Sequence, residues 1–307
     1  MKRRLISQAV ARPAPPLVDP QLLAGLEDLE LVARTAVEGF LQGLHRSPYV
    51  GFSVEFASHR EYLPGDDLRH LNWKVFGRQD RLYVKQYDAE TNLDLHLVLD
   101  WTGSMTTRSG GRAKQRYAAA RAAALAHLAL KQHDAAGLTL FGSTILEHVP
   151  PRAKPHHFEE ILAALGRTPL QKQAESARIL HEVAELMPRR GLVVILSDLF
   201  YEPEDFFSGL DHVLYRGHDV LLFHLLDPLE QDLGVDGTVR FHDLETGEEV
   251  TTRAEDIRTA YRAAVSAWQA GLEEGCRARE MERVPLTTNQ PLARALYDYL
   301  ARRERHF

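Results

Sequence analysis

The sequence predicts a doubly wound, mostly parallel α/β fold with helices on both faces of the sheet. Two observations lead to this fold class: several short segments are almost continuously apolar, and helical segments separate them along the chain. A strand that is apolar on both of its faces is typical of a parallel sheet between two helical layers. The clearest such strands are LDLHLVLD (93–100), RGLVVILSD (190–198) and HDVLLFHLLD (218–227).

The N-terminal part of the chain has a different character. Residues 1–18 are basic and proline-rich, which predicts a disordered arm. Apolar residues at helical spacing predict a helix over 21–44. The segments 51–56 and 81–87 alternate between apolar and polar residues, as strands do. We therefore expect residues 19–91 to form a helix and a small β-containing module.

Residues 92–236 are expected to form the α/β domain. The alanine-rich segment 111–134 predicts a long helix directly after the first strand, and Gly137 follows its end. Two apolar runs within 137–149 predict a pair of strands joined by a tight turn. Further helices are predicted over 156–166, 174–187 and 203–217.

The C-terminal part combines a hairpin with helices. Alternating residues over 238–252 predict a β-hairpin. The sequence leaves open that this region, 237–252, completes the small N-terminal β module. Residues 253–307 predict two helices, roughly 253–283 and 289–304, that pack on the α/β domain.

Composition argues against several classes of function. The formal net charge of -6 argues against general affinity for nucleic acid. No run of about 18 apolar residues offers a membrane span. The single cysteine, Cys276, excludes a disulfide within the chain and fits a reducing cytoplasm. The chain also lacks G-x-S-x-G, Walker A and H-E-x-x-H sequences, which are the motifs of common hydrolases, ATPases and zinc enzymes.

Polar side chains follow three of the predicted strands at the point where each strand ends. In DWTGSM, Asp100, Thr102 and Ser104 alternate, so that one carboxylate and two hydroxyls can point to a common place. Asp198 and Asp227 end two further strands. Ligands of open α/β sheets bind outside the carboxyl ends of the strands. Because Mg²⁺ prefers oxygen ligands, the sequence predicts a cation site in the DWTGSM loop that Asp198 closes.

A second interpretation of these residues stays open. A hydroxyl-rich loop after a strand is also typical of a helix N-cap, in which side-chain oxygens accept hydrogen bonds from backbone N–H groups. Asp198 and Asp227 could likewise cap helices or bind loop amides. In that case the loop would hold no ion, and the chain would be a scaffold with a degenerate site.

The motif D-x-[ST]-x-S, an alanine-rich helix and a later strand ending in Ser-Asp together resemble the metal-ion-dependent adhesion site of von Willebrand factor A domains. More narrowly, the chain resembles the domain of unknown function 58 family, proteins similar to partners of MoxR-type AAA+ ATPases. The likeness covers nearly all of the chain after the arm. The stretches that carry it are GFSVEF (51–56), REYLPGDDLR (60–69), NWK (72–74), RLYVK (81–85), DWTGSM (100–105) and RGLVVILSD (190–198).

This resemblance implies that the DWTGSM loop binds Mg²⁺ or Mn²⁺, with Asp198 as a carboxylate from a second loop. The family's threonine from a middle loop has no direct counterpart, because Ala174 stands near that position. Ser176 or Thr168 would then supply the ligand, or the site would lack it.

The polar connector REYLPGDDLRHLNWK (60–74) carries charged residues around two aromatic ones. One interpretation is a docking surface for a partner protein. The other is a turn that Arg–Asp pairs hold together and that its tryptophan anchors against the α/β domain. The residues concerned are Arg60, Tyr62, Asp66, Asp67, Arg69, Trp73 and Lys74.

Together these observations favour a non-enzymatic protein-interaction module of von Willebrand A type. A divalent cation would capture a carboxylate of a partner or client protein. By resemblance, a MoxR-type AAA+ ATPase would supply nucleotide hydrolysis in a chaperone-like assembly or maturation. The opposing hypothesis is a metal-dependent phosphohydrolase that uses Asp100 and Asp198, for which the sequence offers no clear general base.

Overall fold

The computed structural model describes residues 29–45, 59–61, 83–85, 93–109, 113–154, 156–171, 179–200, 203–242 and 249–290 of the 307-residue chain. Most of the region before residue 93 lies outside these ranges. The predicted arm over 1–18 and the predicted strand over 51–56 therefore concern residues that are not described.

A six-stranded sheet with the order β10-β7-β6-β3-β4-β5 forms the centre of the fold. Its neighbouring strands are parallel except for β4 and β5, which form an antiparallel hairpin at one edge. This confirms the predicted mostly parallel, doubly wound α/β fold. The strands are β3 (Asp94–Asp100), β4 (Ala135–Phe141), β5 (Ile145–Arg152), β6 (Gly191–Ser197), β7 (Asp219–Leu226) and β10 (Glu282–Thr287).

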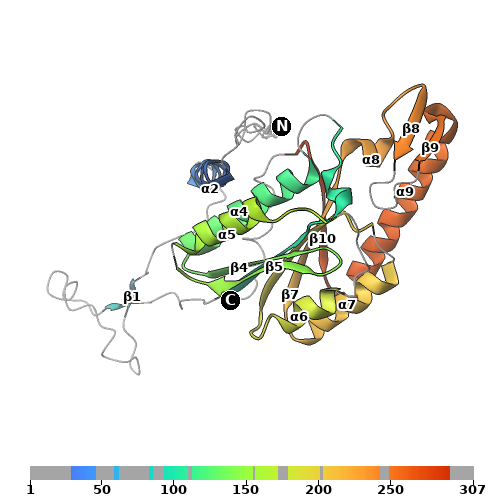
Figure 1. The fold of residues 1–307 in the computed structure, drawn as a ribbon. Coiled ribbons are helices and arrows are strands. Elements are labelled where there is room, and N and C mark those ends of the chain that lie inside the picture. The colour runs from blue at the N-terminus through green and yellow to red at the C-terminus, as the bar shows by residue number, and fades with distance from the viewer. Residues whose placement is uncertain are drawn as a thin grey trace, which may run out of the picture.

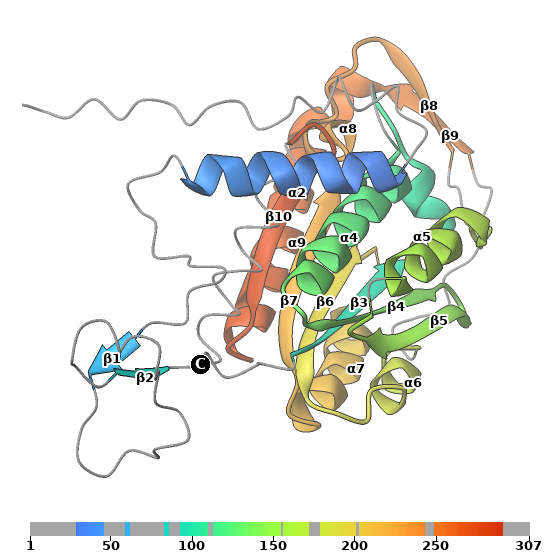
Figure 2. The same cartoon turned by 90° about the vertical axis from the view of Figure 1, so that its left-hand side faces the viewer.

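Helices cover both faces of this sheet (Figures 1 and 2). One apolar cluster packs α2, α4 and α5 on one face, and a second packs α6, α7 and α9 on the other. Successive side chains of a strand point to opposite faces, so Leu97 joins the first cluster and Val98 the second. The helices are α2 (Leu29–His45), α4 (Lys114–Lys131), α5 (His157–Arg167), α6 (Ile179–Glu185), α7 (Pro203–Tyr215) and α9 (Ala254–Arg277).

The strand order reverses between β3 and β6. From β3 the sheet continues through β4 to β5, and from β6 it continues through β7 to β10. Ligands of open α/β sheets bind at such a switch point, outside the carboxyl ends of the strands. Asp100 ends β3 there, and Asp198 directly follows β6.

The alanine-rich helix α4 lies across the sheet beside this switch point, as Figure 2 shows. Its alanines are short, so the helix can approach the strands closely; Ala118, Ala122 and Ala129 are completely buried. The helix brings its first residue, Lys114, into contact with Asp198 at the carboxyl edge of the sheet.

The structure adds a sixth strand, β10, that the sequence analysis does not predict. A helix is expected over 253–283, but α9 ends at Arg277 and the chain then enters β10, which pairs with β7. Pro285 obscures the strand pattern, and an edge strand tolerates proline because one side of its backbone needs no partner. The sheet thus continues beyond residue 236, the expected end of the α/β domain.

The helix expected over 289–304 lies almost wholly outside the described residues. The same is true of the first residues of the N-terminal helix expected over 21–44, since α2 is described from Leu29.

Two short antiparallel pairs form sheets of their own. β1 (His59–Glu61) pairs with β2 (Tyr83–Lys85), and β8 (Thr238–His242) pairs with β9 (Glu249–Arg253). Among the described residues these two sheets are separate, and no strand pairing joins the β8–β9 hairpin to β1 or β2. It packs at the start of α9 and projects from the body of the molecule in Figure 1.

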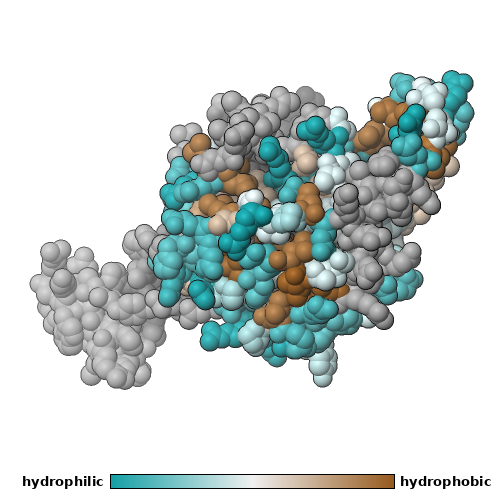
Figure 3. Space-filling view, in the orientation of Figure 1, coloured by the Kyte–Doolittle hydropathy of each residue, from teal (hydrophilic) through white to brown (hydrophobic). Residues whose placement is uncertain are grey.

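Within the described ranges, no helix has both the length and the apolar character that are required to cross a membrane. Figure 3 shows hydrophilic side chains over much of one face, with smaller apolar patches between them.

Candidate functional site

Three aspartates stand at the carboxyl ends of neighbouring strands. Asp100 ends β3, Asp198 follows β6 and Asp227 follows β7, in the strand order β7-β6-β3. Their exposed fractions are 0%, 1% and 1%. A buried carboxylate is costly unless it is paired or hydrogen-bonded. The partners of each aspartate therefore determine what the site can do.

Asp100 gathers the hydroxyls of its own loop. Its Oδ1 accepts hydrogen bonds from the Thr102 hydroxyl, at 2.7 Å, and from the Thr102 backbone N–H, at 3.1 Å. The Thr102 Oγ1 lies 3.0 Å from the Ser104 Oγ. Three side-chain oxygens from alternate residues thus lie together at the end of β3.

A second strand contributes to the same carboxylate. Ser197, the last residue of β6, donates its hydroxyl to Asp100 Oδ2 at 2.6 Å and accepts from the Leu199 N–H at 3.0 Å. Its side chain is completely buried. The sequence analysis names the aspartate of the Ser-Asp pair and overlooks this serine, although a hydroxyl at the end of an apolar strand is itself a signal.

The hydroxyls of the Asp100 loop are not helix caps. After Thr102 the chain enters a short 3-10 helix, η2 (Gly103–Thr106), in which the Thr102 side chain makes no capping hydrogen bond. That hydroxyl is bonded to Asp100 instead. The capping interpretation is therefore wrong for Thr102.

The capping interpretation is confirmed at Asp227. Its side chain accepts from the Leu229 N–H at 3.0 Å, and Glu230 accepts from the Asp227 N–H at 2.7 Å, which makes a capping box at the start of α8 (Pro228–Asp232). Asp227 Oδ2 also accepts from the Ser109 N–H at 3.0 Å. Asp227 therefore ties the loop after η2 to the end of β7.

Asp198 is paired with a buried lysine. Lys114 is 0% exposed, and its Nζ lies 2.7 Å from Asp198 Oδ2 and 2.6 Å from Glu230 Oε1. The other oxygen of Asp198 accepts a longer bond, 3.4 Å, from the Phe200 N–H. Asp198 is expected to close the cation site, but in the structure its carboxylate faces an ammonium group of the protein itself.

Lys114 stays charged in this position. Burial alone would lower the pKa of its ammonium, but the carboxylates of Asp198 and Glu230 outweigh this effect and raise the pKa above its usual range. A cation in the first turn of a helix lies at the positive end of the helix dipole, which is unfavourable without such partners. A lysine in the first turn of a predicted helix is therefore a sequence signal for an acidic partner, and the sequence analysis overlooks it.

His224 fixes the backbone of the loop after β6. Burial, and then the charge of Arg283, lower the pKa of His224 to about 4, so the ring is neutral near neutral pH. Its Nδ1 accepts from the Arg283 guanidinium at 2.7 Å, which leaves the hydrogen on Nε2 to donate to the Asp198 carbonyl at 3.1 Å. Both ring nitrogens are thereby used.

An aromatic pair borders the same loop. Phe200 stacks on Trp268 of α9 with the ring centroids 5.4 Å apart and an interplanar angle of 16°. The Lys114 Nζ lies 4.9 Å from the Phe200 centroid. Phe200 is 47% exposed, so it presents an aromatic surface beside Asp198.

The middle loop reaches the Asp100 loop through its backbone. Gln171 N–H donates to the Trp101 carbonyl at 3.1 Å, and the Trp101 indole donates to the Thr168 carbonyl at 2.9 Å. The Thr168 hydroxyl donates to the Ala164 carbonyl at 2.8 Å, so it is used within its own helix. The alternative ligand, Ser176, lies outside the described residues.

The proposed docking connector also lies mostly outside the described residues. Arg60 belongs to β1, of which the backbone alone is described. The others fall outside the described ranges: Tyr62, Asp66, Asp67, Arg69, Trp73 and Lys74.

The oxygens of Asp100, Thr102 and Ser104 fit a hard divalent cation. Mg²⁺ takes carboxylate and other oxygen ligands and usually keeps several waters, so a partial set of protein ligands is sufficient. Among the described residues, no three His, Cys, Asp or Glu side chains are grouped to hold a metal ion. The Asp100 loop differs from such groups because two of its three oxygens are hydroxyls.

Sequence comparisons relate the chain to a protein family. A family model described as protein of unknown function DUF58 matches residues 58–271. An uncharacterized protein of Mycobacterium tuberculosis is 31% identical over 232 residues, 75% of this chain and 73% of that protein. An uncharacterized protein of Mycobacterium avium is 29% identical over 138 residues, 43% of this chain and 80% of that protein.

Solved structures give more distant likenesses. The crystal structure of the conserved hypothetical protein BatB from Bacteroides thetaiotaomicron matches 67% of this chain and 98% of that chain, with a TM-score of 0.44 and 13% identity. The SpRpn10 VWA domain matches 67% of this chain and 94% of that chain, with a TM-score of 0.39 and 10% identity.

Proposed function

Because the chain belongs to the family described as protein of unknown function DUF58 and has a von Willebrand A-like fold, we propose that it is a non-catalytic protein-interaction module. In this proposal Asp100, Thr102 and Ser104 hold Mg²⁺ or Mn²⁺, with Ser197 orienting the carboxylate. A carboxylate of a partner or client protein completes the site. The bound ion would supply the positive charge that attracts this carboxylate.

The observation that carries the proposal is the set of hydroxyls around Asp100. Thr102 contacts one carboxylate oxygen at 2.7 Å and Ser197 contacts the other at 2.6 Å. These hydroxyls orient the carboxylate, and Ser104 adds a further oxygen to the loop. A rigid carboxylate flanked by hydroxyls is suited to a hard cation at the switch point of the sheet.

The pairing of Asp198 with Lys114 supports capture of an external acid. Two aspartates on one divalent ion would cancel its charge. Asp198 Oδ2 is already paired with Lys114 at 2.7 Å, so in this proposal Asp100 is the one carboxylate on the ion, and the ion keeps a net positive charge. Charges attract each other more strongly in a site with little water than on an open surface, where ion pairs contribute little.

A MoxR-type AAA+ ATPase is the proposed partner, in a chaperone-like assembly or maturation of a client protein. The sequence resemblance supports this partner, and the absence of a Walker A sequence from the chain means that nucleotide hydrolysis would come from the partner. The proposed compartment is the cytoplasm. The one cysteine, Cys276, is buried, and burial raises the pKa of its thiol to about 11, which fits an unreactive structural residue.

Titration calorimetry with Mg²⁺ and Mn²⁺ tests the cation site. The wild-type protein and a Ser208→Ala control, altered at an exposed position of α7, should bind the ion, whereas Ser104→Ala should bind it at least tenfold more weakly. Absence of binding to the wild type would instead support the scaffold with a degenerate site.

A capture experiment tests the partner. The protein is immobilised and a MoxR-type ATPase of the same organism is applied with Mg²⁺ or with EDTA. Retention in Mg²⁺ that is lost in EDTA and in Asp100→Asn supports the proposal. Retention that is indifferent to EDTA would separate partner recognition from the cation, and no retention at all would count against this partner.

The contacts of Asp198 provide no general base of the kind that the phosphohydrolase hypothesis requires. His224 touches this loop, but both of its ring nitrogens are engaged by Asp198 and Arg283. Phosphatase assays with Mg²⁺ should therefore show no turnover. Turnover that Asp100→Ala abolishes would overturn the non-catalytic proposal.

A further inference from the structure

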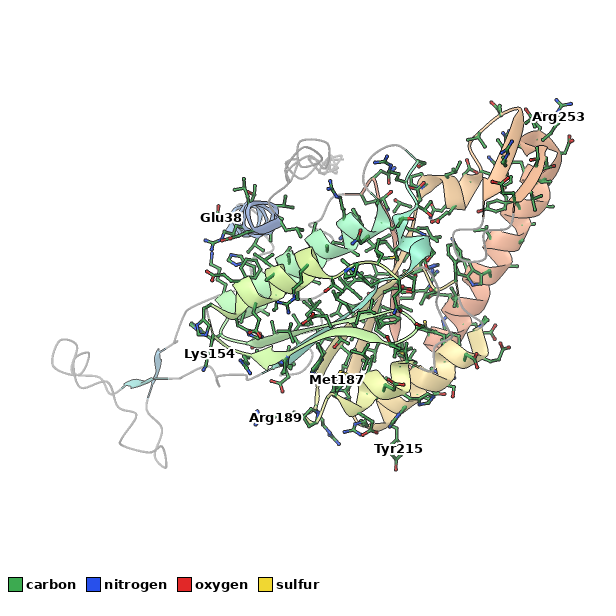
Figure 4. The ribbon with its side chains drawn as sticks, in the orientation of Figure 1. Glu38, Lys154, Met187, Arg189, Tyr215 and Arg253 are labelled. Carbon is green, nitrogen blue, oxygen red and sulfur yellow. The ribbon has the colours of Figure 1, made fainter. Side chains whose placement is uncertain are left out.

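One histidine of α6 and one of α7 face each other, on the side of the sheet opposite α4. His181 of α6 and His212 of α7 place their Nδ1 atoms 3.2 Å apart. The ring centroids are 5.4 Å apart and the planes are inclined by 39°. Figure 4 shows the two helices side by side, with Met187 just beyond the end of α6 and Tyr215 at the end of α7.

The separation of these nitrogens matches two ligands of one metal ion. Zinc binds histidine nitrogen at about 2.0–2.1 Å in tetrahedral geometry, which places two ligating nitrogens about 3.3 Å apart. A direct hydrogen bond would also give a short distance, but it needs a hydrogen on one of the two Nδ1 atoms. A metal ion needs a lone pair on both Nδ1 atoms, so in that arrangement the hydrogen of each ring lies on Nε2.

A carboxylate stands on the far side of the His212 ring. Glu185 Oε1 lies 3.3 Å from His212 Nε2, and the other oxygen of Glu185 accepts from Arg216 at 3.0 Å. A carboxylate in this position favours a hydrogen on Nε2, which leaves the lone pair of Nδ1 directed at His181. A carboxylate that orients a ligating histidine through its second nitrogen is a common feature of zinc sites.

We infer that His181 and His212 form a binding site for a first-row transition metal ion, with Zn²⁺ as the ion whose ligand spacing they match. Glu185, held by Arg216, orients His212. The His212 side chain is 28% exposed, so an ion can reach the pair from solvent. Since no third His, Cys, Asp or Glu side chain of the described residues completes a metal group there, water fills the other positions.

This site differs in chemistry from the proposed site at Asp100. Imidazole nitrogens select Zn²⁺, Ni²⁺ and Cu²⁺, whereas carboxylate and hydroxyl oxygens select Mg²⁺ and Mn²⁺. An ion between His181 and His212 would join α6 to α7, two helices that share one apolar cluster. The inference therefore goes beyond the proposed function and does not depend on it.

Zn²⁺ calorimetry on the full chain tests the inference. Three variants are compared with the wild type: His181→Ala, His212→Ala and, as a matched control, the exposed His156→Ala. Wild type and control should share one class of Zn²⁺ site that each of the other variants loses or binds at least tenfold more weakly. Glu185→Gln should keep the site with an affinity reduced about tenfold, as expected for a group that orients a ligand.

Thermal unfolding gives a second measurement. Zn²⁺ should raise the unfolding temperature of the wild type and of His156→Ala, and Mg²⁺ at the same concentration should not reproduce the His181-dependent part of this shift. The inference is overturned if the His181 and His212 variants bind as much Zn²⁺, with the same affinity, as the control. The contact would then be a hydrogen-bonded histidine pair.

Discussion

A buried aspartate ends β3 and another directly follows β6, yet the two carboxylates have different surroundings. Asp100 accepts from neutral hydroxyls, those of Thr102 and Ser197. Asp198 is paired with a charged group, the ammonium of Lys114. The same residue type at the same edge of the sheet therefore has hydroxyl partners in one loop and an ammonium partner in the other.

This difference shows that the place of an aspartate at the end of a strand does not define its role. The third aspartate, Asp227, has yet another one, because it caps α8. The partners that each carboxylate meets come from other elements: α4 supplies Lys114 to the β6 loop, and β6 supplies Ser197 to the β3 loop.

The largest effect is expected from Lys114→Met. This change leaves Asp198 and Glu230 without their common cation, and breaking a buried ion pair in this way costs about 3–5 kcal/mol. Urea unfolding monitored by circular dichroism measures the loss. Lys131→Met, at the exposed end of the same helix, should cost far less. If both variants lost the same free energy of unfolding, the ion pair of Lys114 would not be a feature that distinguishes the β6 loop from the β3 loop.

Ser197→Ala tests the hydroxyl side of the comparison. It removes the 2.6 Å hydrogen bond to Asp100 and is expected to destabilise the protein by about 2 kcal/mol, since bonds to charged groups are the stronger ones. The same urea experiment applies, with the exposed Ser208→Ala as control. A cost no greater than that of the control would mean that Ser197 does not support the carboxylate.

Mg²⁺ should stabilise the folded protein through the β3 loop alone. At a concentration ten times the dissociation constant, one bound ion adds about 1.4 kcal/mol to the free energy of unfolding. Ser104→Ala should lose this increment, which unfolding with and without Mg²⁺ measures. His224→Gln, which alters a contact of the β6 loop, should retain it. Loss in both variants would contradict the assignment of the ion to the β3 loop.

The smallest effect concerns acidification and the β6 loop. Because the pKa of His224 is lowered to about 4 by burial and then by Arg283, this ring stays neutral in the folded protein while it gains a proton in the unfolded chain. The stabilising contribution of the neutral His224 ring is therefore fully present above the ordinary histidine pKa of about 6.5, and it is lost as the pH falls towards 4.

Between pH 7.5 and pH 6, this residue should cost about 0.8 kcal/mol of unfolding free energy. Urea unfolding at the two pH values measures the difference. His224→Gln should show a smaller loss on acidification than the exposed control His156→Gln. Identical losses would show that His224 does not couple the β6 loop to pH.

Much of the fold follows from local patterns. Strands such as β6 and β7 are apolar on both faces, and this pattern predicts them together with the helices that cover them. Strand β10 escaped prediction because Pro285 interrupts it and because its pairing with β7 is not encoded locally. The hairpin of β8 and β9 was predicted as a hairpin, but its separation from the N-terminal pair depends on tertiary contacts.

The loop after β3 was predictable to a similar degree. Alternate positions of one loop lie close together, so the spacing of Asp100, Thr102 and Ser104 is sufficient to bring their oxygens near one another. The partners of Asp198 were not predictable in this way. Lys114 precedes Asp198 by 84 positions, and Glu230 follows Lys114 by 116.

The sequence by itself determined the layered fold and the hydroxyl-lined loop, because both arise from the periodicity of a few consecutive residues. The tertiary structure alone decided which carboxylate meets an ammonium group and that two histidines of separate helices face each other. Such pairings depend on how whole elements pack, since the buried charges and rings find partners far away along the chain.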